Sequence, residues 1–375
     1  MRHNYQEIND DWQLAHLLHH EGKTIRCCAF KDVNLTAETE LALQHEYVDC
    51  IFLGCTLPKG FKQRIRDSLV FPKMTETYDC FRSRLYSARS LYEGYRLGDP
   101  ESYENCFDGI VYRNYLRDGK LNANIKETLA RSLHDNSIST ALHELLGNFD
   151  EKQVVGVMGG HDLLRSDPQF EQVARISKQL TEKGSIMISG GGPGAMEATH
   201  LGAWMAGRSE EDFKEALQML CTAPSYKDML WLDTAMQVTR RFPQRDFLSI
   251  GIPTWLYGHE PSTPLALCIA KYFDNSIRED GILRLAFGGI IFTPGSAGTL
   301  QEIFQDAVQN HYLSFGYASP MCFLGRRFWT EEVPVYPFLQ DMVARGRYRN
   351  LLLSLSDDSE DIVQQLIQFR ENRQK

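Results

Sequence analysis

Short apolar runs alternate with amphipathic stretches along the second half of the chain. The stretches 299–313 and 360–371 place apolar residues three and four positions apart, which is helical spacing. Uninterrupted apolar strands that alternate with helices are typical of a parallel sheet covered by helices on both faces. We therefore predict an α/β fold with a doubly wound parallel sheet, whose ligands bind beyond the carboxyl ends of its strands. The predicted strands are the apolar runs at 154–158, 185–189, 247–252, 288–292, 320–324 and 351–355.

The first part of the chain has a more mixed pattern. Segments 24–31 and 46–55 predict short strands. Segment 122–147 has apolar residues at helical spacing and ends at a glycine, as helices often do. The polar step 148–153 then predicts a linker.

Two domains follow from this change of pattern. We expect an α+β and helical N-terminal extension over residues 1–150 and a Rossmann-like domain over residues 151–375. The stretch 207–246 is longer than an ordinary connection, so it predicts a helical insertion. No internal repeat is apparent in either part.

Composition narrows the class of protein. The chain has 375 residues, of which 43% are hydrophobic and 24% charged, and its formal net charge is -9. This is ordinary globular composition, and it excludes wholesale disorder. The apolar runs are shorter than the ~18 residues that a membrane helix needs. The acidic balance disfavours a sequence-independent nucleic-acid binder, which needs a basic face.

Cysteines and leader signals bear on the compartment. The nine cysteines are odd in number and lack paired zinc-type spacing, which indicates reduced thiols. The first residues turn acidic at once and have no apolar secretory core. The histidines at 16, 19 and 20 lack a companion acid at metal-ligand spacing. We therefore predict a cytoplasmic protein that uses no metal and no cofactor, and that binds neither nucleic acid nor membrane.

The strongest local motif is SGGGPGAMEA at 189–198. Its glycines leave the backbone free to approach an anion, and the helix that follows offers unpaired N–H groups and a partial positive charge. A tight turn without a ligand is the alternative interpretation. The next strand does not end in an acidic residue, so an NAD site is disfavoured. The candidate phosphate-binding residues are Gly190, Gly191, Gly192 and Gly194.

A second strand runs into a helix through TPGSAGTLQEIF at 293–304. Backbone N–H groups and hydroxyls of Gly295, Ser296, Gly298 and Thr299 are candidate phosphate ligands. Glu302 lies in the first turns of this helix, where a carboxylate either stabilises the helix end or does chemistry. Two such turns in one sheet, the second with an acid, predict a phosphate site beside a catalytic carboxylate.

These two motifs, in this order, resemble the Lonely Guy (LOG) family, whose members are often labelled lysine decarboxylase-like. The form GPGAMEA and the triplet Gly159-Gly160-His161 are similar to its larger bacterial branch, the nucleotide 5′-monophosphate nucleosidases. The resemblance covers roughly 154–325. It implies a phosphoribohydrolase, an N-glycosyl hydrolase that cleaves nucleoside 5′-monophosphates to free base and ribose 5-phosphate. It also implies a homodimer or a higher homo-oligomer.

The resemblance also implies roles for single residues. Glu302 and Arg278 match the catalytic pair, and Arg284 matches a second family arginine. Ser296 departs from the family, which usually has glycine there, so its Cβ narrows the expected phosphate site. The possible substrate contacts are Gly159, Gly160, His161, Met196, Glu197 and Trp255.

The residue types in these motifs suit this chemistry independently of the family resemblance. Glycosidic cleavage passes through an oxocarbenium-like state, which a carboxylate stabilises. An arginine holds phosphate or ribose hydroxyls through its planar fork. The alternative function is a non-catalytic nucleotide sensor or carrier on the same fold. The basic cluster Arg240, Arg241 and Arg245 is interpreted as a solvated face of the insertion.

Overall fold

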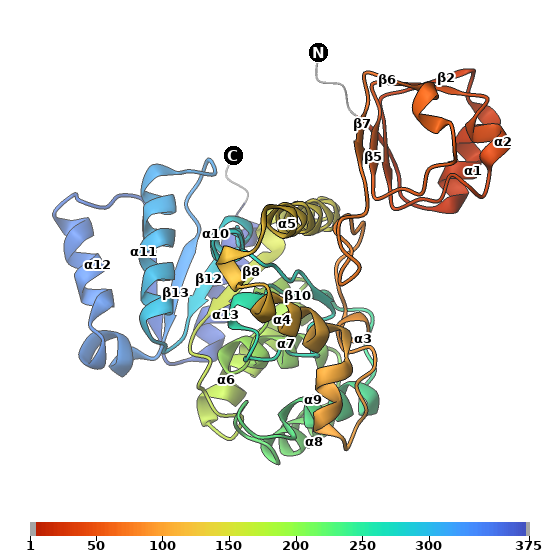
Figure 1. Ribbon diagram of the computed structural model, residues 1–375. Helices are drawn as coiled ribbons and strands as arrows, with labels where there is room; N and C mark the ends of the chain where they lie inside the picture. Colours follow the sequence, from red (N-terminus) through yellow and green to blue (C-terminus); the bar gives the residue numbers. More distant parts are fainter. Residues whose placement is uncertain (1–4, 373–375) are drawn as a thin grey trace. The chain divides into compact units, whose positions relative to one another are not determined.

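The computed structural model describes residues 5–372, which form two compact units. One unit contains the residues up to Leu85 together with Arg113–His143. The other contains Tyr86–Tyr112 together with the residues from Glu144 onward. These bounds differ from the expected division at residue 150, because the segment Tyr86–Tyr112 belongs with the C-terminal part. Figure 1 shows both units along the chain.

The larger unit is built on a seven-stranded sheet in which all neighbouring strands are parallel. Its strand order is β11-β10-β9-β8-β12-β13-β14, so every predicted run supplies a strand. The chain adds β9 to β11 on one side of β8 and then returns to add β12 to β14 on the other side. The strands are β8 (Val154–Met158), β9 (Ile186–Ser189), β10 (Ser249–Gly251), β11 (Cys268–Ile269), β12 (Gly289–Phe292), β13 (Pro320–Leu324) and β14 (Leu352–Ser356).

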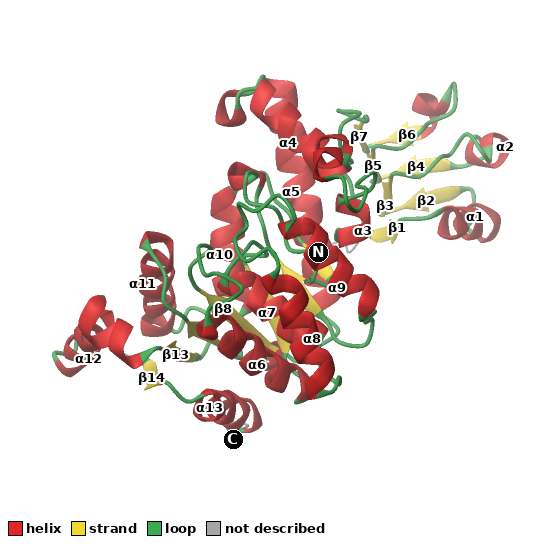
Figure 2. Ribbon diagram, turned by 90° about the horizontal axis from the view of Figure 1, so that it is seen from below, coloured by secondary structure: helices red, strands yellow, loops and turns green. Residues whose placement is uncertain are grey.

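Helices flank this sheet, which confirms the predicted doubly wound α/β class (Figure 2). The helix α6 packs against α7 and α13, and α10 packs against α11. The predicted insertion forms α8 and α9. The helices of this part are α6 (Pro168–Glu182), α7 (Ala195–Trp204), α8 (Glu210–Cys221), α9 (Trp231–Arg241), α10 (Asn275–Leu285), α11 (Ala297–Tyr312), α12 (Val335–Ala344) and α13 (Ser359–Glu371), with the short turns η4 (Glu151–Gln153) and η6 (Phe328–Glu332).

The apolar pattern explains the sheet's burial. Every residue of β8, β9, β10, β12 and β13 is buried, as continuous apolar runs require when both faces are covered. The reversal of strand order between β8 and β12 creates a topological switch point, where ligands of open α/β sheets bind. The second glycine motif follows β12 at this point, and the first follows β9, which lies beside β8.

The segment Tyr86–Tyr112 is anchored by a buried ion pair. The Asp108 carboxylate lies 2.7 Å from Nζ of Lys271, and both side chains are at most 1% exposed. Tyr86 forms an antiparallel bridge with Ile269 at the end of β11. Burial of this pair explains why the segment packs with the sheet although it precedes the predicted boundary. The segment contains α3 (Ala88–Leu91), η2 (Pro100–Asn105) and the start of α4 (Phe107–Arg117).

The smaller unit contains a solenoid of short parallel strands, which we call the coil. Its repeating structure corrects the expectation that the chain has no internal repeat. Each turn of chain adds one strand to each of two parallel sheets, ordered β1-β3-β5-β7 and β2-β4-β6. Figure 1 shows its four-sided outline. The predicted strands 24–31 and 46–55 each contain two strands with a corner between them. The strands are β1 (Gln6–Ile8), β2 (Thr24–Arg26), β3 (Cys28–Lys31), β4 (Glu46–Val48), β5 (Ile51–Leu53), β6 (Ile65–Arg66) and β7 (Leu69–Phe71).

The corners of this coil have a common backbone conformation. Cys27, Asp49 and Asp67 all have φ near 50°, in the left-handed region. The stacked rings of Phe30 and Phe52 fill the interior, with centroids 4.7 Å apart. The helices of this unit are α1 (Asp11–His20), α2 (Thr39–Ala42), η1 (Phe61–Arg64), η3 (Lys120–Asn122) and most of α5 (Ile125–Leu146), the predicted helix.

Among the helices of residues 5–372, none is both long enough and apolar enough to cross a bilayer.

Candidate active site

The carboxyl ends of β8, β9 and β12 surround a cavity of about 290 Å³. Backbone hydrogen bonds tie the three following loops together. Gly160 N–H donates to Pro294 O over 3.1 Å, and Ala195 N–H donates to Gly160 O over 3.1 Å. The cavity is lined by Val157, Met158, Gly159, Gly160, His161, Gly190, Met196, Tyr257, Glu260, Arg278, Glu279, Ser296, Gly298, Thr299 and Glu302.

The first glycine loop lets the arginine of α10 approach the backbone. A Cβ at Gly190 would lie 2.2 Å from Nη2 of Arg278 and 2.5 Å from Sδ of Met196, so a larger residue here would displace the ends of these two side chains. Gly194 has φ of 69°, a conformation that favours glycine, and it begins α7. Gly191, Gly192 and Gly194 therefore shape the loop without lining the cavity.

The second glycine loop brings the amino end of α11 to the cavity. Ser296 is the N-cap residue, and its side chain makes no capping hydrogen bond. Ser296, Gly298 and Thr299 line the cavity, while Gly295 packs behind them against Thr299. A helix N-terminus offers unpaired N–H groups and a partial positive charge to an anion. The predicted phosphate ligands are thus divided between residues that face the cavity and residues that position them.

Glu302 and Arg278 line the same cavity from neighbouring helices. Glu302 is 8% exposed. Burial raises the pKa of its carboxyl to about 7, although the positive charge of Arg278 acts in the opposite direction and lowers it. The Nε of Arg278 donates to Ile252 O over 3.1 Å, which fixes the guanidinium, and its Nη2 lies 4.0 Å from Sδ of Met196, another residue that lines the cavity. A carboxyl and a guanidinium therefore meet beside an anion-binding helix end.

Arg284 lies elsewhere. It is exposed, does not line the cavity, and follows Arg278 by six residues along α10. That spacing is ~120° from alignment on a helix, so the two arginines lie on different faces.

Some cavity residues were missed by the sequence interpretation. Glu260 lines the cavity with its side chain 17% exposed, and its Oε1 lies 3.9 Å from Nε2 of His161. Glu279 also lines it. Glu260 belongs to PTWLYGHEP, the segment after β10, so the signal that could have found it was its place at the carboxyl edge of the sheet. Tyr257 of the same segment, which that place does predict as a contact for the base, lines the cavity.

Trp255, predicted as a possible substrate contact, does not line the cavity. Its side chain is fully buried, and its Nε1 donates to Oδ1 of Asp108 over 2.9 Å. Trp255 begins the short turn η5 (Trp255–Tyr257), and residues two apart in such a turn face different directions. Trp255 therefore packs inward, whereas Tyr257 lines the cavity.

Glu197, also predicted as a possible substrate contact, does not line the cavity either. It is fully buried in α7, and both of its oxygens accept from Arg165, over 2.7 Å from Nε and 2.5 Å from Nη2. Arg165 further donates to Ala223 O and to Thr234 Oγ1. This pair joins α7 to the insertion. Met196, its neighbour, does line the cavity.

A second buried acid lies one helical turn beyond Glu302. Asp306 is 2% exposed, and burial raises its pKa to about 8. Its Oδ2 has no hydrogen-bond partner among the described residues. Burial without a counterion favours the neutral form of a carboxyl, so Asp306 is protonated at neutral pH.

The described residues form no cluster of side chains suited to bind a metal ion. Over residues 5–372, no three histidine, cysteine or acidic side chains are grouped as metal ligands would be. The expected absence of a metal and of a cofactor stays a prediction.

Comparison with known proteins finds only distant structural similarity. No protein-family model and no curated protein sequence matches the chain. TM1055, a structural-genomics target, aligns with 57% of this chain and 98% of its own, at 19% identity and a TM-score of 0.37. The Moco carrier protein of Chlamydomonas reinhardtii aligns with 58% of this chain and 96% of its own, at 16% identity and a TM-score of 0.35. The molybdenum cofactor binding protein of the phototrophic bacterium Rippkaea orientalis aligns with 57% of this chain and 96% of its own, at 15% identity and a TM-score of 0.32. Similarity at this level transfers no ligand and no activity to the chain.

Proposed function

We propose that this protein hydrolyses the N-glycosidic bond of nucleoside 5′-monophosphates to free base and ribose 5-phosphate. The observation that carries the proposal is the buried carboxyl of Glu302, whose pKa is raised to about 7, in one cavity with Arg278. A site that only binds an anion gains nothing from a buried acid, because an ionised acid repels the ligand. A site that cleaves a glycosidic bond needs such a group.

The phosphate of the substrate is proposed to bind at the amino end of α11. Gly298 and Thr299 face the cavity there, and Gly190 faces it from the other glycine loop. Fixing a phosphate remote from the reacting bond supplies binding energy that positions the sugar. The volume of about 290 Å³ lies near the lower end of ligand sites, about 300–1,000 Å³, which suits a mononucleotide.

Glu302 is proposed to act on the anomeric carbon. As the C1′–N bond breaks, the sugar becomes oxocarbenium-like, and an ionised carboxylate stabilises this charge. The same carboxylate accepts a proton from water as the water oxygen bonds to C1′. The departing base takes up a proton, so one water is consumed for each bond cleaved.

Arg278 is proposed to hold the phosphate or the ribose hydroxyls. Its Nε is already engaged by Ile252 O, so the outer nitrogens are the donors left for a ligand. A guanidinium held in this way loses little freedom when it binds. Glu260, Tyr257 and His161 also line this cavity and are available to contact the base.

Incubation of the pure protein with AMP, GMP, IMP, CMP and UMP tests this proposal. Chromatography should detect free base and ribose 5-phosphate in equal amounts. Adenosine is the matched control, because both glycine loops favour an anion; its kcat/KM should fall far below that of AMP. Tight binding of intact nucleotide without release of base would favour a sensor or carrier instead.

The assembly and the compartment remain proposals. We propose a homodimer in the cytoplasm. Exposed apolar side chains support self-association: Tyr312 on α11 and Phe338 on α12 are 72% and 47% exposed. Light scattering after size-exclusion chromatography measures the oligomeric state directly.

A further inference from the structure

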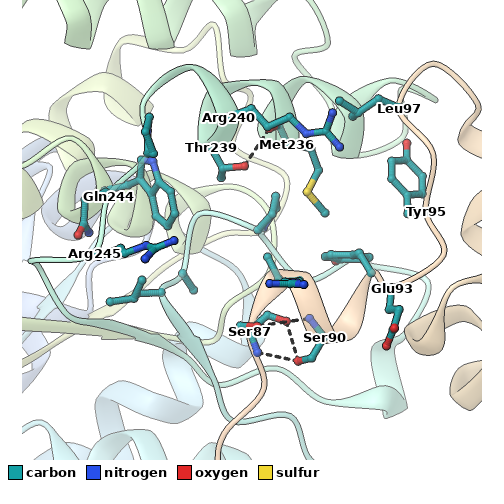
Figure 3. A pocket seen from close by; sticks show the side chains of 18 residues that line it. Ser87, Ser90, Glu93, Tyr95, Leu97, Met236, Thr239, Arg240, Gln244 and Arg245 are labelled. Atoms are coloured by element: carbon teal, nitrogen blue, oxygen red, sulfur yellow. Dashed lines mark hydrogen bonds between the residues drawn. The ribbon is translucent and has the colours of Figure 1, made fainter.

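A second cavity lies in the larger unit and shares no lining residue with the candidate active site. Its volume is about 680 Å³. Its walls come from α3, α9, the segment that follows α9, and the segment that precedes β11 (Figure 3). Three arginines line it, one on α3, one on α9 and one beyond α9: Arg89, Arg240 and Arg245. We call this cavity the arginine pocket.

The three arginines carry charges that no side chain neutralises. All three are exposed, and none forms an ion pair among residues 5–372 of the structure. Arg241, next to Arg240 in sequence, turns away and pairs with Glu215, at 2.9 Å from Nε to Oε1. Like charges brought to one cavity repel each other, so a bound anion relieves a cost that the protein alone leaves in place.

Other polar groups in the pocket already have partners. Ser87 and Ser90 bond to each other's backbone at the start of α3. Gln244 bonds to both backbone groups of Phe247, and the Thr239 hydroxyl donates to Met236 O. The guanidinium N–H groups are the charged donors of the pocket, and their planar forks match phosphate or carboxylate oxygens.

The single acid of the pocket stands apart from one of the arginines. Glu93 is the one carboxylate among its lining residues. Figure 3 shows Arg245 and Glu93 on opposite sides of the cavity. Three arginines against one acid leave an excess of two positive charges at the lining, which favours a ligand with more than one negative charge.

The remaining surface is apolar. Trp204, Met236 and Leu267 line the pocket, with Leu97 and Pro264 beside them. The indole N–H of Trp204 already donates to Phe242 O over 2.7 Å, so the ring contributes only apolar surface here. Apolar walls with a few convergent charges are typical of sites for organic anions rather than for bare ions.

We propose that the arginine pocket binds a phosphorylated molecule that also carries a flat apolar group, such as a nucleoside diphosphate. The phosphates contact Arg89, Arg240 and Arg245, and the apolar group packs against Trp204 and Met236. This site is separate from the cavity of Glu302 and does not depend on cleavage there.

Calorimetric titration of the full chain with ADP, pyrophosphate and adenosine tests the proposal. ADP should bind more tightly than either of its parts, since only ADP satisfies both the arginines and the apolar wall. Its affinity should fall as salt rises, because exposed charges are screened. Failure of ADP to bind, or equal affinity for pyrophosphate and ADP, overturns the proposal.

Variants separate this pocket from the candidate active site. The double variant Arg240→Ala/Arg245→Ala should weaken ADP binding at least ~10-fold, since each loses charge-assisted hydrogen bonds. Arg241→Ala, which removes a neighbouring arginine outside the pocket, should leave the affinity unchanged. Arg89→Ala, in a different segment, should repeat the loss. ADP binding that survives the pocket variants but is lost in Arg278→Ala places the ligand in the other cavity and refutes the proposal.

Discussion

Glu302 and Asp306 lie one turn apart on α11, and both carboxyl groups are buried. Burial raises the pKa of Glu302 to about 7 and that of Asp306 to about 8. Arg278 faces Glu302, whereas Oδ2 of Asp306 has no partner among the described residues. One helix thus carries an acid that ionises near neutral pH and an acid that stays protonated there.

Asp306→Asn should stabilise the protein at neutral and alkaline pH. The folded pKa of about 8 lies above the unfolded value near 3.8, so wild type loses stability as pH rises from about 4 to 8. Asparagine mimics the protonated acid and avoids this loss. Its melting temperature should exceed that of wild type by at least ~3 °C at pH 8, about 1 kcal/mol for a unit of this size. The gain should shrink toward zero at pH 4; a gain independent of pH would contradict the burial argument.

Cleavage of AMP should depend on the ionisation of Glu302. Only the ionised carboxylate stabilises an oxocarbenium-like state, and its pKa is raised to about 7. The kcat/KM should therefore rise with pH through about 7 and level off above it. Initial rates at low substrate between pH 5.5 and 8.5, with circular dichroism as a check on folding, measure this. A flat profile would argue against Glu302 as the titrating group.

Glu197→Ala should destabilise the fold. Removing one partner of a buried ion pair leaves an uncompensated charge and typically costs about 3–5 kcal/mol. Urea unfolding of the variant measures the loss. Glu171→Ala is the matched control, because its pair with Arg175 is only partly buried and is worth about 1 kcal/mol or less. Unchanged stability with lost cleavage would instead make Glu197 a substrate contact.

Arg278→Ala and Arg284→Ala should behave differently. Arg278 lines the cavity and is held by Ile252 O, so its loss should lower kcat/KM at least ~100-fold with little effect on the melting temperature. Arg284 is exposed and outside the cavity, so its variant should cleave AMP within about twofold of wild type, as surface substitutions usually do. Loss of activity in Arg284→Ala alone would reassign the functional arginine.

The sheet and the two glycine loops could be predicted because their signals are local. Each strand is a continuous apolar run, and Glu302 lies a fixed distance along the helix that follows PGSAG. Side-chain direction could not be predicted: Trp255 and Tyr257 are two residues apart, yet one is buried under Asp108 and the other faces the cavity. The partner of Glu197 could not be predicted either, because Arg165 lies 32 residues away in sequence.

The N-terminal coil was missed for a different reason. Arg26 pairs with Val48, 22 residues on, whereas Val48 pairs with Arg66, 18 residues on. Turns of unequal length hide the repeat from a search for a fixed period. Its corners also use Cys27, Asp49 and Asp67 rather than glycine, so they carry no clear turn signal.

The central claim is that Glu302 does chemistry, and Glu302→Gln tests it most directly. The substitution removes the charge and keeps the shape, so the protein should fold and still bind AMP. Loss of one preorganised electrostatic group typically lowers the rate ~10²–10³-fold. The measurement is the single-turnover rate of adenine release by wild type and Glu302→Gln at pH 8, where the carboxylate is mostly ionised. We predict a fall of at least ~100-fold; a variant that keeps more than about a tenth of the wild-type rate would contradict the account.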